Sequence, residues 1–322
     1  MKLPGVWMEL IQTPGLLNRR IPMRPLIKSL SDNKRALGWA LSLPALLAIL
    51  AIVVIPVIQS LIQSFYQRDL SRPQLDAFIG LLNYQNLFAD ARYLHSVLAT
   101  FRFSLISVIF ELILGVSIAL VLDKNFVGRG FVRGLMILPW AMPSIVNAAM
   151  WKWIYNADYG VLNALLTQVG ILDQYKIWLS DPFWATALII LANVWKETPF
   201  TVLMVLAALQ TVPEELYEAA KVDGSSAWQS FFSITVPLIL PVLMIVSMLQ
   251  FIWGFQTYEL ITIITGGGPF STTEMVTLRV YATTFRSLRF GYGSAMAYLT
   301  SLFILVPVVI YIRSAYKKVV EY

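Results

Sequence analysis

The amino-acid sequence predicts an all-α membrane protein with about six transmembrane helices. Of its 322 residues, 58% are hydrophobic and only 13% are charged. The hydrophobic residues gather into stretches of the ~20 residues that a helix needs to cross the hydrocarbon core of a bilayer. Along the chain, the expected spans are 37–65, 100–122, 133–155, 183–210, 236–258 and 292–312.

Composition also excludes several classes of function. The chain has no cysteine, which rules out disulfides and thiolate metal sites, and His95 is its single histidine. The glycine cluster 266–268 lacks the Lys-Ser/Thr pair that completes a phosphate-binding loop. We therefore expect no catalytic residue, no metal and no cofactor in this chain. The net charge of +6 is interpreted as a signal of membrane orientation, with no nucleic-acid partner.

The distribution of basic residues predicts the orientation. Fourteen Lys and Arg fall in segments expected on one side of the membrane, and seven fall in the loops 66–99, 156–182 and 259–291. Because cytoplasmic segments carry the excess of basic residues, both termini are expected in the cytoplasm. Residues 1–35 have no apolar core or cleavage site of a signal peptide. We expect them to be a cytoplasmic lead-in to a membrane domain of residues 36–322.

Prolines are frequent inside the expected spans. Pro139 and Pro143 interrupt the third span, Pro199 the fourth, and Pro237 and Pro241 open the fifth. Each removes a backbone donor and favours a kink. Two interpretations remain open: helices bent around a central pathway, or ordinary variety in membrane helix packing.

The loop 211–235, between the fourth and fifth spans, is the most distinctive segment. Thr211 is the expected N-cap of a short helix, and Glu214 would complete a capping box with it. Gly224 is expected to end this helix, after which Ser225 or Ser226 can cap a second short helix.

Small and charged side chains of this loop allow two interpretations. Ala219, Ala220 and Gly224 permit close approach by another protein, with Glu218 and Asp223 at the rim. The alternative is an amphipathic connector that lies on the membrane surface.

A longer pattern favours the first interpretation. Glu218-Ala219-Ala220, then Asp223-Gly224, and after nine further residues Ile234 and Pro237 resemble the coupling loop of binding-protein-dependent ABC importer permeases. That family usually has leucine where this chain has Val236. The resemblance implies that the loop docks on a separate ATPase subunit and transmits its nucleotide-driven closure.

Other stretches resemble the carbohydrate-uptake branch of the same family: "FIGLLNYQNLF" (78–88), "LPWAMPSIVNAAMWKWIY" (138–155), "VWKETPF" (194–200) and "ITGGGP" (264–269). The first and last are similar to the larger of the two maltose- or trehalose-type permease subunits. The resemblance implies a type I ABC importer permease fold in a bacterial or archaeal plasma membrane. It also implies four kinds of partner: a second permease subunit in a heterodimer, two ATPase subunits that bind ATP and Mg, an extracytoplasmic solute-binding protein and the lipid bilayer.

Three charged residues lie near the middle of an expected span. Glu111 is near the middle of the second span, and Lys196 and Glu197 are near the middle of the fourth. A charge at a helix centre costs about 2.5–3.5 kcal/mol on insertion scales, so such a residue normally faces a cavity or a partner. Adjacent positions of a helix point in different directions, so we expect Lys196 and Glu197 not to pair with each other. An ion pair between Glu111 and Lys196 is the alternative to a role in the pathway.

The fifth span carries amides and a tryptophan at intervals of three residues. Gln250, Trp253 and Gln256 are expected on one helical face. A sugar ring can stack on the indole while the amides bond its hydroxyls, although helix packing would also use such residues. Resemblance to maltose-type permeases extends the expected substrate pathway to Lys196, Glu197 and Phe200.

Two other classes of protein are weighed against an importer subunit. A secondary transporter that runs on an ion gradient is expected to show an inverted repeat and midplane carboxylates, and no repeat is apparent. A membrane enzyme would need more groups for acid–base or metal chemistry than one histidine supplies. The expected function is therefore ATP-driven import of a sugar, or of a related polyol or glycoside.

Overall fold

The structure, a computed structural model, describes residues 34–320, so nearly all of the expected lead-in 1–35 lies outside the described residues. The chain divides into two compact units, Met1–Ser60 and Leu61–Tyr322. Five helices of the described part are long and apolar enough to cross a membrane, and a bent helix pair brings the number to six when the pair is counted as one span. The expectation of an all-α membrane protein with about six spans is confirmed.

The first span is a run of three helical segments: α2 (Lys34–Ile49), a π-helical turn (Leu50–Val54) and α3 (Ile55–Ser64). The π-helical turn ends two residues before Pro56. Proline has no N–H for the i−4 carbonyl and its ring crowds that carbonyl, so a wider turn lets the helix continue. The fifth span uses the same device before Pro237, where the π-helical turn Phe231–Thr235 precedes α12 (Val236–Gln256).

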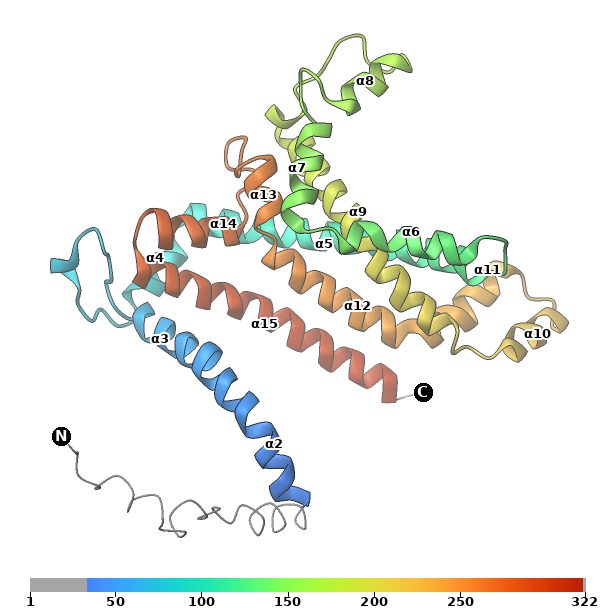
Figure 1. Cartoon of the computed structure of the whole chain (residues 1–322), viewed down its shortest axis with the longest axis horizontal. Coiled ribbons are helices and arrows are strands. Elements are labelled where there is room, and N and C mark those ends of the chain that lie inside the picture. The colour runs from blue at the N-terminus through green and yellow to red at the C-terminus, as the bar shows by residue number, and fades with distance from the viewer. Residues whose placement is uncertain (1–33, 321–322) are drawn as a thin grey trace, which may run out of the picture. The chain divides into compact units, whose positions relative to one another are not determined.

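Three helices form the centre of the larger unit: α5 (Ala91–Asp123), α9 (Pro182–Leu209) and α12 pack against one another (Figure 1). Glycines allow the close packing. A Cβ on Gly115 would lie 2.4 Å from the Thr201 methyl, and one on Gly254 would lie 2.6 Å from Ser104 Oγ. Near the end of α9, Val202, Val205 and Leu209 are buried in an apolar cluster with residues of α5 and α12.

Helix α15 (Phe290–Val320) runs beside α12 and packs on α4 (Leu82–Ala89). The short helix α14 (Val276–Tyr281) is tied to the start of α5 by charged side chains. Asp90 caps α5 by accepting from the N–H groups of Arg92 and Tyr93, and its Oδ2 lies 3.0 Å from Arg279 Nη2. Glu274 joins this network through Arg92 Nε, at 2.8 Å.

This cap changes the boundary of the second span. The sequence predicts a start at residue 100, whereas α5 begins at Ala91 because Asp90 satisfies its first free N–H groups. The nine additional residues form an extension that carries polar side chains such as Arg92 and Ser96.

The third expected span is broken. Residues 133–155 divide between α6 (Arg129–Ala141) and α7 (Ser144–Ile154), whose axes differ by 93°. Met142, which precedes Pro143, has an extended backbone, as the ring of a following proline requires. Pro139 lies inside α6 without breaking it, so the break belongs to Pro143 alone. A bend at the prolines is confirmed for this span, whereas α9 continues through Pro199, which was expected to interrupt it, and α12 continues through Pro241. That the bend surrounds a central pathway stays a prediction.

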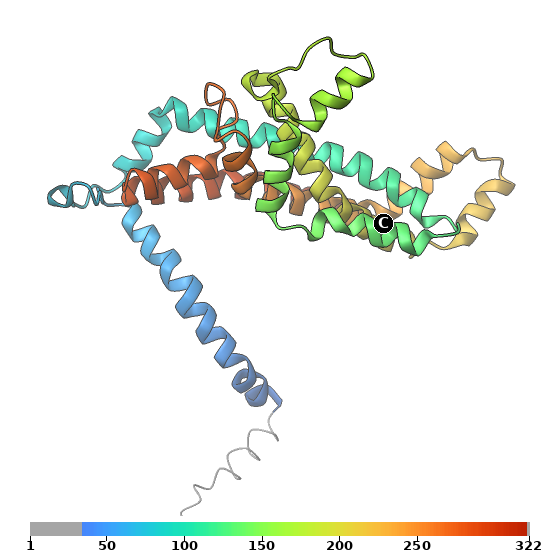
Figure 2. The ribbon, with the colours of Figure 1, turned by 45° about the horizontal axis from the view of Figure 1, so that its top comes forward.

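The loop expected to carry the coupling function contains α10 (Glu214–Val222) and α11 (Ala227–Ser230). It lies at the end of the larger unit away from α4 (Figures 1 and 2). Ser226 caps α11 and forms a complete capping box with Gln229, as one of the two predicted alternatives had it. However, α11 is not a separate helix, because the chain continues from Ala227 to Gln256 as one helical span.

The predicted capping box of α10 is wrong. Its N-cap is Pro213, which has no side-chain hydrogen bond, and Thr211 instead donates from Oγ1 to the Ala208 carbonyl at 2.8 Å. Thr211 therefore closes the end of α9.

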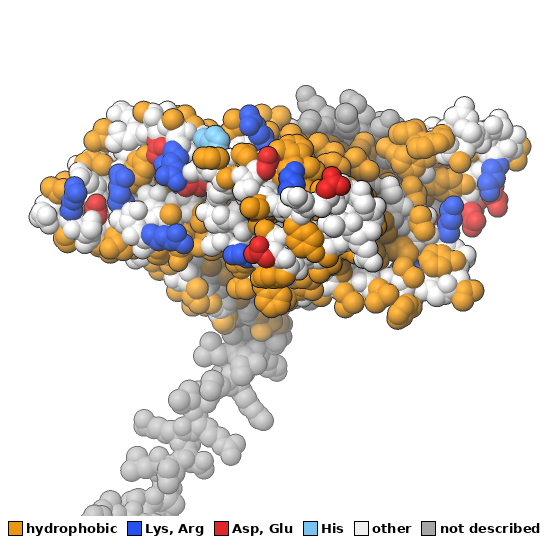
Figure 3. Space-filling view, turned by 90° about the horizontal axis from the view of Figure 1, so that it is seen from above, with side chains coloured by type: hydrophobic (Ala, Val, Ile, Leu, Met, Phe, Trp, Pro, Cys, Tyr) orange, Lys and Arg blue, Asp and Glu red, His pale blue; other side chains and the backbone are white. Residues whose placement is uncertain are grey.

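Seen from above, hydrophobic side chains cover much of the surface, with charged side chains gathered mainly at the two ends and near the middle (Figure 3).

Candidate functional site

A polar cavity of about 200 Å³ lies where α7, α9 and the start of α13 (Glu259–Ile264) meet the end of α12. Ser144 and Asn147, which follow the break in the third span, are part of its wall. Its lining consists of Ser144, Asn147, Asn193, Lys196, Glu197, Trp253, Gln256, Thr257, Glu259 and Leu260. Four of the six residues predicted for the substrate pathway are among them.

Lys196 and Glu197 form an ion pair in this cavity, contrary to the sequence-based expectation. Lys196 Nζ lies 2.8 Å from Glu197 Oε1, and the two side chains are only 14% and 15% exposed. The prediction considered the directions of the Cα–Cβ bonds, but both positions border the same cavity. Their long side chains can therefore meet there. Because both groups are largely removed from water, the pairing offsets part of the cost of placing charge in a span.

Glu111 does not pair with Lys196, so that alternative is wrong as well. Its side chain is 1% exposed and Oε1 accepts from Asn193 Nδ2 at 3.0 Å. The second oxygen, Oε2, is buried and has no hydrogen-bond partner in the part of the chain that the structure describes. Glu111 thus lies behind the cavity wall, connected to it through Asn193.

The predicted stripe on α12 does not share one surface. Trp253 and Gln256 line the cavity, whereas Gln250 is 3% exposed and donates to the Glu197 carbonyl at 3.1 Å and to Thr201 Oγ1 at 3.2 Å. Residues three apart differ by about 60° around a helix axis, so positions 250 and 256 lie about 120° apart. Gln250 therefore fastens α12 to α9.

Phe200 does not line the cavity either, but it supports one of its walls. Its ring packs edge-on against Trp253, with ring centroids 4.9 Å apart, and stacks on Trp140 of α6 at 5.9 Å. This contact fixes the indole that faces the cavity. The role of these residues in a substrate path stays a prediction.

Several lining residues are absent from the sequence-based prediction. Ser144, Asn147 and Asn193 are polar residues in apolar spans, which is a signal that could have found them. Asn147 is 1% exposed and its Oδ1 has no hydrogen-bond partner among the described residues. Thr257 and Glu259 follow the end of α12 and carry no such signal, because only the fold brings them to the cavity.

The coupling segment, residues 214–230, presents the predicted residues to solvent. Glu218, Ala219 and Asp223 are exposed, and Ala220 is partly buried. Gly224 has a φ of +77°, which favours glycine, and the Ser225 N–H that follows it donates to the Ala220 carbonyl at 2.9 Å. Tyr217 and Thr235 share a hydrogen bond of 2.8 Å that ties α10 to the foot of the fifth span. Contact with an ATPase stays a prediction.

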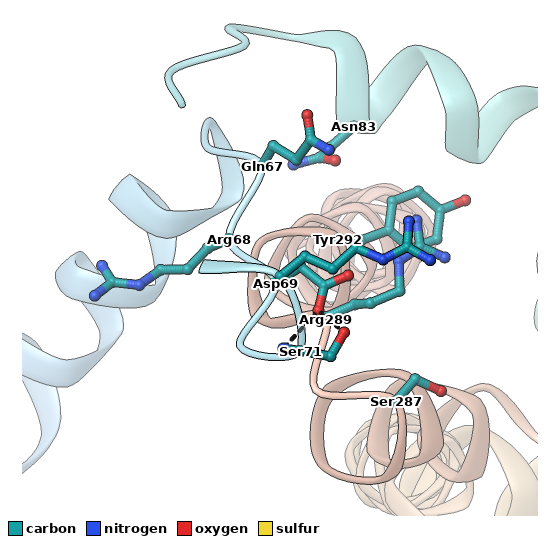
Figure 4. A pocket seen from close by; sticks show the side chains of 9 residues that line it. Gln67, Arg68, Asp69, Ser71, Asn83, Ser287, Arg289 and Tyr292 are labelled. Carbon is teal, nitrogen blue, oxygen red and sulfur yellow. Dashed lines mark hydrogen bonds between the residues drawn. The ribbon is translucent and has the colours of Figure 1, made fainter. Parts of the chain in front are cut away.

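A second polar pocket, of about 410 Å³, lies at the opposite end of the larger unit, near the start of α15 (Figure 4). Backbone hydrogen bonds from Leu70 to the Leu288 carbonyl and from Gly291 to the Arg68 carbonyl hold its walls together. Arg68, Arg72 and Arg289 line it with Asp69. Hydrogen bonds from Ser71, first of all from its hydroxyl, lower the pKa of Asp69. Nothing in the sequence pattern predicted this pocket.

Known proteins resemble the chain over most of its length. Residues 111–318 match the family of binding-protein-dependent transport system inner membrane components. The trehalose/maltose transport system permease protein MalF of Thermococcus litoralis is 36% identical over 89% of this chain and 96% of its own length. The sulfoquinovosyl glycerol transport system permease protein SmoG of Agrobacterium fabrum is 33% identical over 87% of this chain and 90% of its own length.

A solved structure shows the same fold. A crystal structure of a bacterial ABC transporter involved in the import of the acidic polysaccharide alginate contains a chain that superposes with a TM-score of 0.77. The alignment covers 91% of this chain and 99% of the other, at 22% identity. With the fold, the spans and these relatives in agreement, the chain belongs to the binding-protein-dependent transport system inner membrane component family, the membrane-spanning permeases of ABC importers.

Proposed function

We propose that this chain is a permease subunit of an ATP-driven importer that moves a sugar, or a related polyol or glycoside, into the cytoplasm. The observation that carries the proposal is the polar cavity inside a bundle of membrane spans, lined by Trp253, Asn147 and Gln256. An indole face with amides around it suits a polyhydroxylated ring. Relatives named for transport of trehalose, maltose and sulfoquinovosyl glycerol support this solute class.

The proposed assembly contains a second permease subunit, two ATPase subunits that bind ATP and Mg, and an extracytoplasmic solute-binding protein. Support comes from the exposed segment around Gly224, which suits docking of an ATPase, and from a solved relative in complex with a periplasmic binding protein. The excess of basic residues supports a cytoplasmic location of both termini in a bacterial or archaeal inner membrane.

The test is uptake by the complete complex in liposomes. With ATP inside and the loaded binding protein outside, labelled sugar should accumulate, and it should not accumulate when a non-hydrolysable ATP analogue replaces ATP. The isolated chain should hydrolyse no ATP. Uptake by the chain under an ion gradient without ATPase subunits would support the secondary-transporter alternative and overturn the proposal.

A further inference from the structure

The charges around the cavity do not leave a cation free for an anionic solute. Lys196 is the single basic residue of the lining, and Glu197 holds its ammonium group at 2.8 Å. Glu259, which is exposed, adds a second carboxylate, and none of the ion pairs in the described part of the chain includes it. With these three side chains charged, the lining carries one positive and two negative charges.

Two asparagines of the cavity wall support the same conclusion. Asn147 Oδ1 is a buried acceptor with no donor among residues 34–320. Leaving such an acceptor unpaired is costly, so a bound solute that donates to it gains affinity. The Nδ2 of Asn193, which could have served as a donor, is turned to Glu111 at 3.0 Å. A hydroxyl of a solute can donate to Asn147 Oδ1, whereas an ionised carboxylate, sulfonate or phosphate group can only accept hydrogen bonds.

We infer that this cavity takes an uncharged, hydroxyl-rich solute and rejects anionic ones, and that Glu197 sets this preference by occupying Lys196. The inference rests on the proposed function for the identity of the site. It separates this chain from relatives named for solutes with an acidic group, such as sulfoquinovosyl glycerol. The pocket at the other end of the larger unit has the opposite balance of charge, because three arginines line it with one aspartate.

Charged thiol reagents test the sign of the electrostatic potential in the cavity directly. The chain has no cysteine, so Gln256→Cys in the purified complete complex places a single reactive thiol of this subunit on the cavity wall. The partner subunits need to be cysteine-free for this measurement. A cationic and an anionic methanethiosulfonate are compared by their labelling rates, each divided by its rate with 2-mercaptoethanol. A cleft of one sign concentrates the opposite charge by about tenfold or more, so the cationic reagent should be favoured by at least that ratio.

Two variants and a control sharpen this experiment. In Glu197→Gln the preference for the cationic reagent should fall several-fold, because Lys196 becomes unpaired, and in Lys196→Met it should rise. Gln168→Cys, on the exposed end of α8 (Val161–Gln168), should label with a ratio near that of the free thiol. Equal normalised rates at position 256, or a preference for the anionic reagent, would overturn the inference. These rates need neither ATP nor transport, so they stand apart from a failure of the proposed function.

Protection of the same thiol tests the solute class. Glycerol, glucose and trehalose are compared with an alginate disaccharide, each at high concentration and without the binding protein. At least one neutral compound should slow labelling of Gln256→Cys several-fold, and the alginate disaccharide should not. Adding Glu197→Gln should allow the acidic sugar to protect, because its carboxylate can then pair with Lys196. Protection by the acidic sugar with Glu197 intact, or by none of the neutral compounds, would contradict the inference.

Discussion

Single atoms decide how closely the spans of this protein pack. Gly254 lies against Ser104, where an added Cβ would lie 2.6 Å from Oγ and 3.1 Å from the Ser104 Cα. Because the second of these neighbours is backbone, it cannot rotate away. We expect Gly254→Ala to destabilise the folded protein by about 1–3 kcal/mol through overpacking.

Thermal unfolding in detergent measures this effect. Gly134→Ala in α6 is the matched control, because no atom lies within 4 Å of its added Cβ, and it should leave the melting temperature unchanged or slightly raised. Combining Gly254→Ala with Ser104→Gly should restore part of the lost stability. Equal melting temperatures of the two alanine variants would show that α12 and α5 leave room for a side chain between Gly254 and Ser104.

A second residue-level prediction concerns pH. Burial would raise the pKa of Asp90, but the Tyr93 N–H and the Arg279 guanidinium outweigh it, so this pKa lies below that of an ordinary aspartate. A carboxyl whose pKa is lowered by folding stabilises the protein above its unfolded pKa. That contribution disappears as pH falls through the folded value.

We therefore expect Asp90→Asn to lower the melting temperature at pH 7, where the ion pair with Arg279 is lost. Asparagine should preserve the cap of α5, so the loss should be smaller than for Asp90→Ala. The difference between wild type and Asp90→Asn should shrink toward pH 3. A constant difference from pH 7 to pH 3 would assign the effect to packing instead of charge.

The helical elements show what sequence patterns can predict. Hydrophobic stretches located all six spans, and the end of a short helix at Gly224 was also predicted, because both depend on local composition. The 93° break between α6 and α7 was only one of two open interpretations, because prolines are also common in membrane helices that pack without a sharp bend. The start of α5 was missed by nine residues because its polar extension lacks a hydrophobic signal.

The cavity was predicted less completely for a related reason. Helical spacing could nominate Trp253 and Gln256, but it could not show that the Lys196 side chain folds back onto Glu197. Nor could it bring Asn147 and Glu259 to the same place, because Asn147 comes from the broken span and Glu259 opens α13. Both depend on tertiary structure.

At the level of elements, the coupling segment gives a further prediction. Gly224 has a positive φ, and no atom lies within 4 Å of the place that a Cβ would occupy, so the penalty of a side chain there is conformational and not steric. Gly224→Val should reduce sugar-stimulated ATP hydrolysis by the assembled complex strongly, whereas Gly224→Asn should be milder because asparagine tolerates this conformation. Ala220→Arg should weaken co-purification of the ATPase subunits.

Membrane insertion and thermal stability provide the control for these variants. Each should reach the membrane and melt close to the wild-type temperature, because the segment is exposed and packs little. Wild-type uptake and wild-type co-purification in all three variants would reduce residues 214–230 to a simple connector.

The whole molecule presents two ends that can be distinguished by labelling. Gln74 lies in the exposed turn Pro73–Leu75 near the arginine-lined pocket, and Glu215 lies on α10 at the other end. With both termini in the cytoplasm, Gln74→Cys should react with a membrane-impermeant maleimide on intact cells or spheroplasts. Glu215→Cys should react only after permeabilisation. The reverse pattern would invert the orientation.

One helix carries both the cavity and the approach to the coupling segment. Lys196 and Glu197 sit near the middle of α9, which runs unbroken to Leu209, and Gln210 to Pro213 lead directly into α10. Between Glu197 and Leu209 the axis is about 18 Å long at 1.5 Å per residue. Gly115 of α5 packs closely against Thr201 of this helix, and Gln250 fastens α12 to the Glu197 carbonyl and to Thr201. Under the proposed function, a movement of α10 caused by nucleotide binding would act on one end of α9, and the other half of the same helix would carry it past Pro199 to the ion pair at the cavity.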